Sequence, residues 1–408
     1  MMHRVRLRHV VHVNPPCVKF DNLTAASALT FMPMEAVWAD SRLDKSRVRL
    51  KSDVAVGYTR FQDGDVLLPK ITPTFEAGRS VTISGLRNGV GAGSTELHVL
   101  RPTREIDARY LTYVTQSHPF LRFGEAEMYG VAGQKRVPDD FVRDFTVDLP
   151  AVEEQRRVVR FLDAEIGRID EVQQARNRMQ RLLRLKRERV IEHLIDDEGG
   201  SRALIPLKHL VEFVTVGIVV TPAAWYVDAG GVPALRGVNV KPGRITDKDL
   251  VHISHEGHLI HHKSRLRVGD LVIVRTGQAG AAAVVPESFD GANCIDLVIV
   301  RPGAALSSKF AEYLLNSSYA KRRVAEFAVG SIQAHFNVAA MKAMPVPHRS
   351  LVDQQRIVLE IDRAIGSIER AVEEMQKQDG LLAERRRALI TAAVTGQIDV
   401  TTARGVDE

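Results

Sequence analysis

The sequence contains one helical segment twice, and this internal repeat constrains the fold more than any other feature. The segment EQRRVVRFLDAEIGRID begins at Glu154, and the segment DQQRIVLEIDRAIGSIE begins at Asp353. Gln155 aligns with Gln354, and the offset between the copies stays constant (354 − 155 = 199). Two matching halves in one chain predict pseudo-two-fold internal symmetry, which suits two identical partners or one target with two half-sites.

The repeat extends into the region that precedes each helical segment. VRLRHVV, from Val5, resembles IPLKHLV, from Ile205, and TELHVLRP, ending at Pro102, resembles IDLVIVRP, ending at Pro302. A chain of 408 residues is also too long for one ordinary hydrophobic core. We therefore divide the chain into a globular half at 1–150, a helix at 151–200, a second globular half at 201–347, and a second helix with a tail at 348–408.

Both globular halves are predicted to mix strands and helices. Short β-branched runs bounded by Gly, Asp or Pro are typical of strands, and they occur at Val66–Leu68, Leu97–Leu100, Leu271–Val274 and Leu297–Val300. Helices are expected at Ala108–Ser117 and Lys309–Ala328, and loops in the glycine-rich segments 86–94 and 275–281. Each half is therefore predicted to be an α+β domain.

The repeated segments are predicted to be two long helices. The first runs without proline to Gly199, and the second ends at Gly396. Their apolar residues recur at steps of three and four, which predicts an antiparallel coiled coil between the two copies. Gly167 and Gly366 recur inside it and indicate either a close backbone approach or merely a tolerated glycine. The predicted packing residues are Val158, Leu162, Ile169, Val172, Leu183, Val190, Ile357, Ile361, Ile368, Leu382 and Leu389.

Composition bounds the function more loosely. A hydrophobic content of 45% with 26% charged residues is typical of a folded protein, and a net charge of +6 favours a polyanionic partner. Cys17 and Cys294 have no disulfide or zinc spacing, which predicts a reducing cytoplasm. No run approaches the ~18 apolar residues of a membrane span, and the N-terminal segment is a poor signal peptide.

With these features, essentially the whole chain resembles the DNA-specificity (S) subunits of Type I restriction–modification systems. The most specific motif is the helix opening that occurs twice, together with the ending RRALITAAVTGQIDV of the second copy. The resemblance implies two target-recognition domains separated by two conserved helices. It also implies a non-catalytic subunit that selects a bipartite double-stranded DNA target with an unread gap.

The resemblance further implies partners. Two methyltransferase (modification) subunits would dock on the chain, and restriction (translocase-nuclease) subunits would join for cleavage. AdoMet, ATP and Mg²⁺ would belong to those partner subunits, so this chain would itself need no cofactor and no metal.

Base reading would require hydrogen-bonding side chains on loops of the two globular halves. Gln134 and Gln333 share the repeat offset (333 − 134 = 199) and form the strongest candidate pair, although each candidate is also compatible with an ordinary surface position. The candidates are Lys70, Arg87, Asn88, Ser94, Thr95, Gln134, Lys135 and Arg136 in the first half, and Arg236, Asn239, Lys241, Arg275, Gln278, Ser331, Gln333 and His335 in the second.

Motifs that suggest chemistry are incomplete. Asn14-Pro15-Pro16-Cys17 is similar to the Asn-Pro-Pro-aromatic motif of adenine methyltransferases, but it has Cys in place of the aromatic residue and no preceding AdoMet loop, which favours a proline turn. The glycine segments lack the Gly-Lys-Ser/Thr of a nucleotide-binding loop, so we expect turns or loops that approach a DNA backbone.

The histidine cluster and the arginines of the first long helix each suggest a binding function, but each is also explained by an ordinary solvent-exposed position. The histidines between His252 and His262 do not match the spacing of a zinc-protease helix, which favours a solvated loop. The arginines of the first long helix are interspersed with glutamates, which favours a solvated or partner-binding face over a DNA-binding one.

Three functional hypotheses follow. The specificity subunit explains the whole pattern. A stand-alone methyltransferase would need an AdoMet-binding loop that the sequence lacks. A structural coiled-coil adaptor would explain the helices but not the two basic, glycine-looped globular halves.

Overall fold

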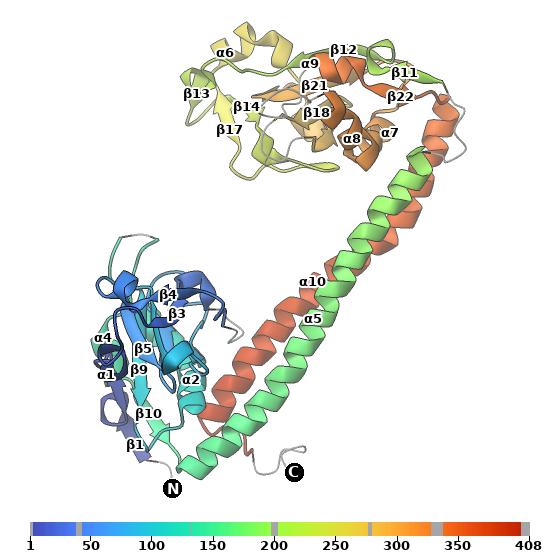
Figure 1. The fold of residues 1–408 in the computed structure, drawn as a ribbon. Helices are drawn as coiled ribbons and strands as arrows, with labels where there is room; N and C mark the ends of the chain where they lie inside the picture. The colour runs from blue at the N-terminus through green and yellow to red at the C-terminus, as the bar shows by residue number, and fades with distance from the viewer. Residues whose placement is uncertain are drawn as a thin grey trace. The chain divides into compact units, whose positions relative to one another are not determined.

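The computed structural model describes residues 3–37, 43–131, 133–196, 203–275, 280–327 and 338–400. It divides into two compact units, residues 1–177 with 375–408 and residues 178–374. Helix α5 (Val152–Asp196) and helix α10 (Leu351–Val394) each contribute one half to each unit. Figure 1 shows the chain coloured by residue number.

The globular domain of unit 1 contains two small sheets. In the first, β9 and β6 are the central strands and all pairs are antiparallel; in the second, β3 and β8 run parallel. The first sheet is β2 (Val11–Val13), β9 (Leu97–Pro102), β6 (Val66–Pro69) and β7 (Val81–Thr82). The second is β4 (Val48–Leu50), β3 (Ala28–Met32), β8 (Val90–Gly93) and β5 (Thr59–Gln62).

Helices and one two-stranded ribbon complete this domain. The ribbon pairs β1 (His3–Arg6) with β10 (Thr146–Leu149), so the beginning of the chain lies beside the strand that leads into α5. The helices are α1 (Val18–Asp21), α2 (Ala108–Gln116), α3 (His118–Ala126) and α4 (Asp139–Asp144).

The globular domain of unit 2 repeats this arrangement. Its antiparallel sheet is β12 (Val211–Val216), β21 (Leu297–Pro302), β18 (Leu271–Val274) and β19 (Ala282–Val284). Its second sheet is β13 (Tyr226–Val227), β17 (Val251–Ile253), β14 (Val232–Leu235) and β20 (Asn293–Cys294), with β14 and β20 parallel.

Two ribbons and four helices complete the second domain. The ribbons are β11 (Leu204–Pro206) with β22 (Pro345–Pro347) and β15 (Val240–Lys241) with β16 (Arg244–Ile245). The helices are α6 (His255–Ile260), α7 (Ser308–Asn316), α8 (Ser318–Phe327) and α9 (Val338–Ala343). The α+β prediction and the four predicted strands are thereby confirmed.

Two local predictions were wrong. The helix predicted at Lys309–Ala328 breaks at Ser317, whose backbone is extended, into α7 and α8. The glycine-rich segment predicted as a loop contains strand β8, because its glycines permit close packing. A Cβ on Gly91 would lie 2.2 Å from the Phe61 ring, and one on Gly93 would lie 2.2 Å from the Met32 carbonyl oxygen.

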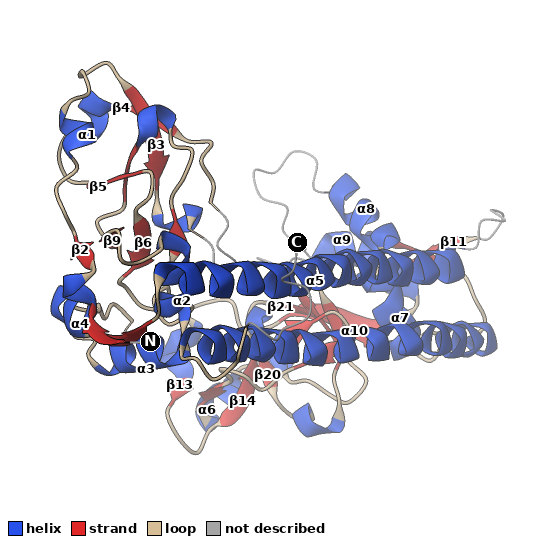
Figure 2. Cartoon of the chain, turned by 90° about the horizontal axis from the view of Figure 1, so that it is seen from below, coloured by secondary structure: helices blue, strands red, loops and turns tan. Residues whose placement is uncertain are grey.

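The two long helices pack side by side and antiparallel, as predicted (Figure 2). In unit 1, Asp170 accepts a hydrogen bond from Arg386 at 2.5 Å, and Arg176, farther along α5, pairs with Asp379, earlier in α10, at 2.8 Å. The residue numbers of the two helices therefore run in opposite directions along the contact.

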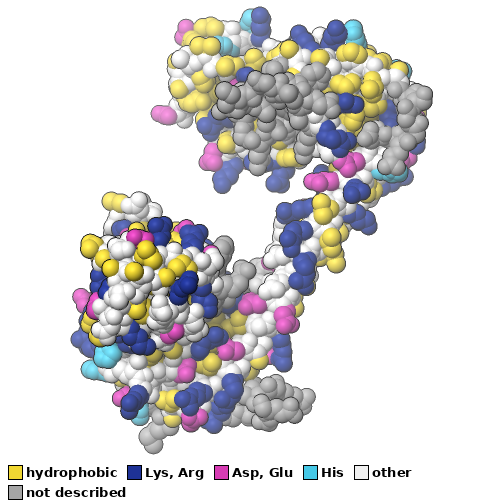
Figure 3. Space-filling model, in the orientation of Figure 1, with side chains coloured by type: hydrophobic (Ala, Val, Ile, Leu, Met, Phe, Trp, Pro, Cys, Tyr) yellow, Lys and Arg dark blue, Asp and Glu magenta, His cyan; other side chains and the backbone are white. Residues whose placement is uncertain are grey.

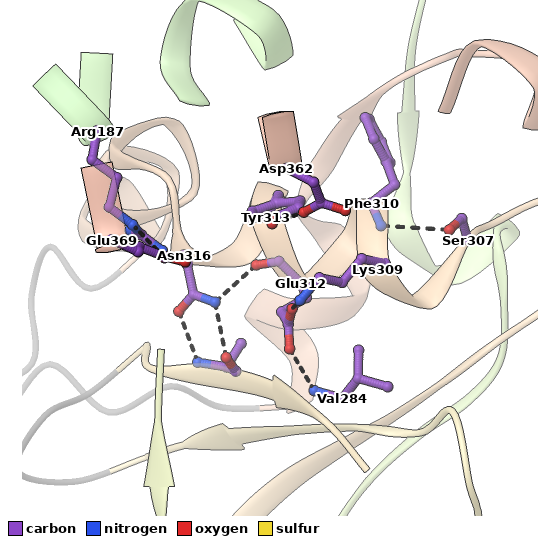
Figure 4. Close-up of polar contacts among 11 residues, drawn as sticks. Arg187, Val284, Ser307, Lys309, Phe310, Glu312, Tyr313, Asn316, Asp362 and Glu369 are labelled. Atoms are coloured by element: carbon purple, nitrogen blue, oxygen red, sulfur yellow. Dashed lines mark hydrogen bonds and ion pairs between the residues drawn. The ribbon is translucent and has the colours of Figure 1, made fainter. Parts of the chain in front are cut away.

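The same direction holds in unit 2. Arg187 lies 3.3 Å from Glu369, and the carbonyl oxygen of Ile195, farther along α5, accepts a hydrogen bond from Arg349, just before α10. Figure 4 shows the Arg187–Glu369 pair beside the contact between Tyr313 of α7 and Asp362 of α10. Asp362, which aligns with Asp163 of the first copy (362 − 163 = 199), thus joins helix α10 to the globular domain.

The register of the helix contact differs from the prediction in one respect. Val172 is 47% exposed, so its assignment to the packing seam was wrong. Steps of four and three from the buried Ile169 lead instead to Gln173, Arg176 and Gln180, which are polar. Since successive helix residues point about 100° apart, Val172 lies on the neighbouring face. Of the other predicted packing residues, Val158, Leu162, Ile169, Ile357, Ile361 and Ile368 are buried, and Leu183, Val190, Leu382 and Leu389 are partly buried.

The two recurring glycines do not mark a close approach. A Cβ on Gly167 would have no atom within 4 Å, and one on Gly366 would lie 3.6 Å from the Arg370 side chain. The interpretation of these residues as a backbone contact was therefore wrong, and tolerated glycines explain them.

The repeated glutamines fasten each long helix to its globular domain. Gln155 is fully buried; its Oε1 accepts from the Asp107 backbone N–H at 2.8 Å, and its Nε2 donates to the carbonyl oxygens of Glu105 and Pro150 at 2.9 and 2.8 Å. Gln354 makes the equivalent three contacts, to the Ser307 N–H and to the Ala305 and Arg349 carbonyl oxygens. One side chain thus satisfies three backbone groups at each junction.

We predict that Gln155→Leu lowers the free energy of unfolding of the chain by at least about 2 kcal/mol, because each buried backbone group left without a partner costs about 1–3 kcal/mol. Urea unfolding followed by circular dichroism measures the change. The matched control is Gln174→Leu, at an exposed position of the same helix, where surface substitutions change stability by about 0.5 kcal/mol or less. Equal urea midpoints for the two variants would contradict the fastening role.

Candidate nucleic-acid interface

Six of the sequence-predicted residues converge in unit 1, where β6 ends and β9 begins. The Lys70 backbone N–H donates to the Glu96 carbonyl oxygen at 2.9 Å, and the Lys70 carbonyl oxygen accepts from Val137 at 2.9 Å. The Thr72 N–H donates to the Lys135 carbonyl oxygen at 3.0 Å. These bonds bring three separate segments together. We call Lys70, Ser94, Thr95, Gln134, Lys135 and Arg136 the first polar edge.

An ion pair holds this edge together. The Nε and Nη2 atoms of Arg136 each donate to the Glu96 carboxylate at 2.8 Å, and Nη1 donates to the Gln134 carbonyl oxygen at 3.2 Å. The hydrogen bonds from Arg136 lower the pKa of the Glu96 carboxyl group, against a smaller opposing effect of its partial burial. Since its donors are engaged within the fold, Arg136 acts as a support for the neighbouring side chains.

A cavity of about 380 Å³ adjoins the first polar edge. Lys70 and Thr95 line it together with Tyr58 and Arg60, two residues that the sequence analysis missed. Tyr58 is 40% exposed, and its ring meets Phe31 edge to face at 5.3 Å. An exposed aromatic ring beside cations suits stacking and phosphate contacts.

The other two candidates of this domain lie at the opposite end of β8. The Arg87 backbone N–H donates to the Thr30 hydroxyl at 3.0 Å, and the Asn88 side chain donates to the Ala28 carbonyl oxygen at 2.9 Å. Both side chains are exposed. The structure therefore does not bring Arg87 and Asn88 to the first polar edge.

Unit 2 has an equivalent edge at the matching position. Arg275 follows β18 as Lys70 follows β6, and Asp296 precedes β21 as Glu96 precedes β9. Arg275 Nη1 lies 2.7 Å from the Asp296 carboxylate. We call Arg275 and Asp296 the second polar edge.

The remaining described candidates of unit 2 have different surroundings. Asn239 is fully buried: its Oδ1 accepts from the Arg236 N–H at 2.9 Å, and its Nδ2 donates to two backbone carbonyl oxygens. It therefore cannot reach a base, and its assignment as a candidate reader was wrong. Arg236 donates to the Asp249 carbonyl oxygen at 2.6 Å, and Lys241 lies partly buried in β15.

Four candidates lie outside the residues that the structure describes. They are Gln278, Ser331, Gln333 and His335. The pairing of Gln134 with Gln333 therefore stays a prediction.

In the Asn-Pro-Pro-Cys motif the chain bends at Asn14 and then leads into helix α1. Asn14 has a positive φ of 50°, its Oδ1 accepts from the Val99 N–H at 2.9 Å, and its Nδ2 donates to Asp139 at 2.8 Å. Its amide is thus engaged within the fold.

The histidine-rich segment is ordered, so its interpretation as a solvated loop was wrong. It spans β17, helix α6 and a 3₁₀ turn at His262–Ser264. His258 Nδ1 lies 2.6 Å from Asn293 Oδ1, and the His261 ring meets Trp225 edge to face. Across the described part of the chain, no cluster of three or more His, Cys, Asp or Glu side chains is arranged to hold a metal ion. Nor is any described helix both long and apolar enough to cross a bilayer.

We predict that Arg136→Gln lowers the urea midpoint of the chain at neutral pH and that this difference shrinks in acid. The folded-state pKa of Glu96 is lowered by Arg136, so the pair stabilises the fold above the ordinary glutamate pKa and loses this effect as pH falls through the lowered folded-state pKa. Urea titrations between neutral pH and about pH 3, well below the glutamate reference pKa of about 4.3, measure the trend.

The control for this titration is Lys135→Gln, an exposed neighbour in the same segment. A difference between wild type and Arg136→Gln that persists unchanged in acid would show that the ion pair does not carry the effect.

Comparison with known proteins identifies two groups of similar chains. No protein-family model matches the chain. It is 38% identical over 157 residues to the Type I restriction enzyme EcoAI specificity subunit of Escherichia coli, a match that covers 38% of this chain and 26% of that protein. It is 37% identical over 159 residues to the EcoEI specificity subunit of the same organism, with the same shares. The chain thus spans about a quarter of the length of these curated relatives.

Similar solved structures cover almost the whole chain. One, from a structure of complex assembly and conformational transition in the type I R-M system, has a TM-score of 0.75 and 19% identity, and covers 97% of this chain and 98% of its own. The HsdS subunit from Thermoanaerobacter tengcongensis has a TM-score of 0.50 and 18% identity, and covers 97% of both chains. At these identities the likeness establishes the fold. The curated relatives confirm the resemblance to specificity subunits that was inferred from the repeated helix.

Proposed function

We propose that this chain is the DNA sequence-specificity subunit of a Type I restriction–modification complex, the class of protein to which its curated relatives belong. The observation that carries the proposal is the duplication. One α+β domain occurs twice, and each copy is fastened to the antiparallel helices by an equivalent buried glutamine. A duplicated recognition domain suits a DNA target that is made of two half-sites.

In this proposal each polar edge contacts one half-site. Lys70 and Thr95, beside Tyr58, supply hydrogen-bonding and stacking groups in the first domain, and Arg275 stands at the matching place in the second. Arg and Lys read guanine in the major groove or bind phosphates, which position the protein without specifying sequence. The chain itself is non-catalytic.

The two long helices act as the spacer in this proposal. Helix α5 links the two domains and has 45 residues, which corresponds to about 67 Å at ~1.5 Å per residue. A helix of this kind would set the number of unread base pairs between the half-sites.

The exposed face of the helices would dock the partner subunits. Figure 3 shows Lys and Arg side chains mixed with Asp and Glu along the visible face of α5 and α10. We infer that two methyltransferase subunits bind there, that restriction subunits join them for cleavage, and that AdoMet, ATP and Mg²⁺ bind to those partners. The complex would act on DNA in the cytoplasm.

The test is selection from random double-stranded DNA by the purified chain together with its methyltransferase subunit. We expect enrichment of a split motif with a constant gap. Replacing residues 1–150 with the corresponding domain of another specificity subunit should change one half of that motif only. Enrichment of no motif would favour the structural adaptor, methylation by the chain alone would favour a stand-alone enzyme, and a change in both halves would contradict modular reading.

A second prediction concerns the polar edges. Lys70→Gln should weaken binding to the selected site. If Lys70 contacts a base, we expect a loss of about 1–3 kcal/mol of binding free energy and relaxed specificity in one half-site. If Lys70 contacts a phosphate, we expect weaker binding to all sequences and a salt slope that is lower by about 1. Fluorescence anisotropy on matched and mutated sites at several salt concentrations separates the two. The control is Arg122→Gln, an exposed cation on α3. If Lys70→Gln and the control give the same affinity and salt dependence, the first polar edge does not contact DNA.

A further inference from the structure

The globular domain of unit 2 contains a basic cavity of about 750 Å³. One wall is β12, with Phe213 and Thr215, and the other is the segment between helix α6 and strand β18, with Lys263, Arg265 and Arg267. We propose that this cavity binds a phosphate-bearing ligand.

Among the described residues, most cations of the cavity have no acidic partner. Arg301 is neutralised by the buried Asp270, with both contacts at 2.7 Å. Arg265 donates to the His258 carbonyl oxygen, at 3.2 and 3.1 Å. Within the described part of the chain, no ion pair is found for the three cations of the wall, Lys263, Arg265 and Arg267.

Asp290 is the carboxylate that lines the cavity, and its Oδ1 accepts a hydrogen bond from the Val268 backbone at 3.1 Å. Three cations therefore face one carboxylate that already has a partner. An anion entering the cavity would gain charge-assisted hydrogen bonds that the fold itself does not supply.

The equivalent arginine of the first domain also lines a cavity, but there it has an acidic partner. Arg60 precedes Asp65 by the same five residues as Arg265 precedes Asp270 (65 − 60 = 270 − 265). In the first domain, however, Arg60 lies 3.2 Å from the Asp21 carboxylate and 4.3 Å from the centre of the Phe20 ring, both from helix α1.

Across the described residues of the second domain, Arg265 has no such carboxylate, and the same segment gains a cation. The position equivalent to Gln62 is Arg267 (267 − 62 = 205, the same offset as 265 − 60). Because two copies of one fold differ in this respect, the positive cavity is a property of the second copy rather than a requirement of the fold.

Neither Arg275 nor Asp296 of the second polar edge lines the cavity. Arg275 follows strand β18, whereas Arg267 precedes it, so the two lie at opposite ends of the strand. On β21, Asp296 precedes the strand and Arg301 lies near its far end.

The dimensions and lining indicate the class of ligand. Sites for nucleotide-sized molecules occupy about 300–1,000 Å³ and combine apolar walls with a few charged groups. Here Phe213 and Leu266 supply apolar surface beside the cations. The phosphate could come from a free nucleoside phosphate or from a DNA backbone, and the two sources share the same chemistry at the cavity.

The test titrates the full-length chain with inorganic pyrophosphate by calorimetry at constant ionic strength. We expect the double variant Lys263→Gln/Arg267→Gln to bind pyrophosphate at least tenfold more weakly than wild type. Both side chains are exposed, so the fold should be retained. The matched control is Arg244→Gln/Lys248→Gln, two exposed cations of the same domain that do not line the cavity, which should stay within twofold of wild type.

The two sources are separated by the salt dependence of DNA binding. If the double variant loses pyrophosphate binding and keeps the wild-type salt dependence, the ligand is a free phosphate compound. If the salt dependence of DNA binding by the double variant falls by the amount expected for the loss of about two phosphate contacts, and pyrophosphate competes with DNA, the ligand is the DNA backbone. Absence of pyrophosphate binding by wild type, or equal binding by wild type and the double variant, would overturn the inference. A chain without DNA sequence preference that still binds pyrophosphate would refute the proposed function alone.

Discussion

Burial of the ends of the long helices in the domain cores is the interaction on which each unit depends. Val158, Leu162 and Ile166 of α5 share one core with Leu7 and Tyr110 of the first domain. In unit 2, residues from both long helices, among them Ile195 and Ile361, share a core with Phe310. Without these contacts the helices would expose their apolar faces, and the small sheets would lose one side of their cores. The helices are therefore structural parts of the domains as well as connectors.

The middle of the helix contact is of a different kind. Near Arg176 the contact is polar: the guanidinium donates to Gln378, Asp379 and the Met375 carbonyl oxygen. Directional hydrogen bonds fix register more strictly than apolar contacts do, although they contribute less net stability. Stability thus comes mainly from the embedded ends, and register from the polar centre.

The fold could be predicted largely from the repeat and from local patterns. Six elements could be recognised in the sequence because their apolar residues follow a regular pattern and their ends are marked by Gly, Asp or Pro. They are the strands β6, β9, β18 and β21 and the two long helices. Strand β8 was missed because its glycines, typical of loops, serve here to let Phe61 and Met32 approach. Val172 was assigned to the helix contact because it is apolar, whereas the neighbouring Gln173 is polar. Which of the two faces α10 depends on the position of that helix, which the sequence of α5 alone does not give.

The candidate interface was less predictable because it depends on long-range backbone pairing. Lys70, Thr95 and Lys135 are far apart in the sequence, and the hydrogen bonds that unite them could not be inferred from residue types. Asn239 looked like a reader because asparagine suits adenine, but its three hydrogen bonds are internal. Arg60 was missed although it shares its spacing from an aspartate with Arg265, a signal that comparison of the two halves could have revealed.

The core of unit 1 combines segments that are almost 400 residues apart in the sequence. Ile390, Val394 and Val400 complete a core that begins at Leu7, and the Tyr110 hydroxyl donates to the Val394 carbonyl oxygen. During translation, the globular domain of unit 1 must therefore wait for residues 390–400 to be synthesised before its core is complete. A stop codon placed before residue 390 would therefore damage a domain whose other residues precede it by more than two hundred positions.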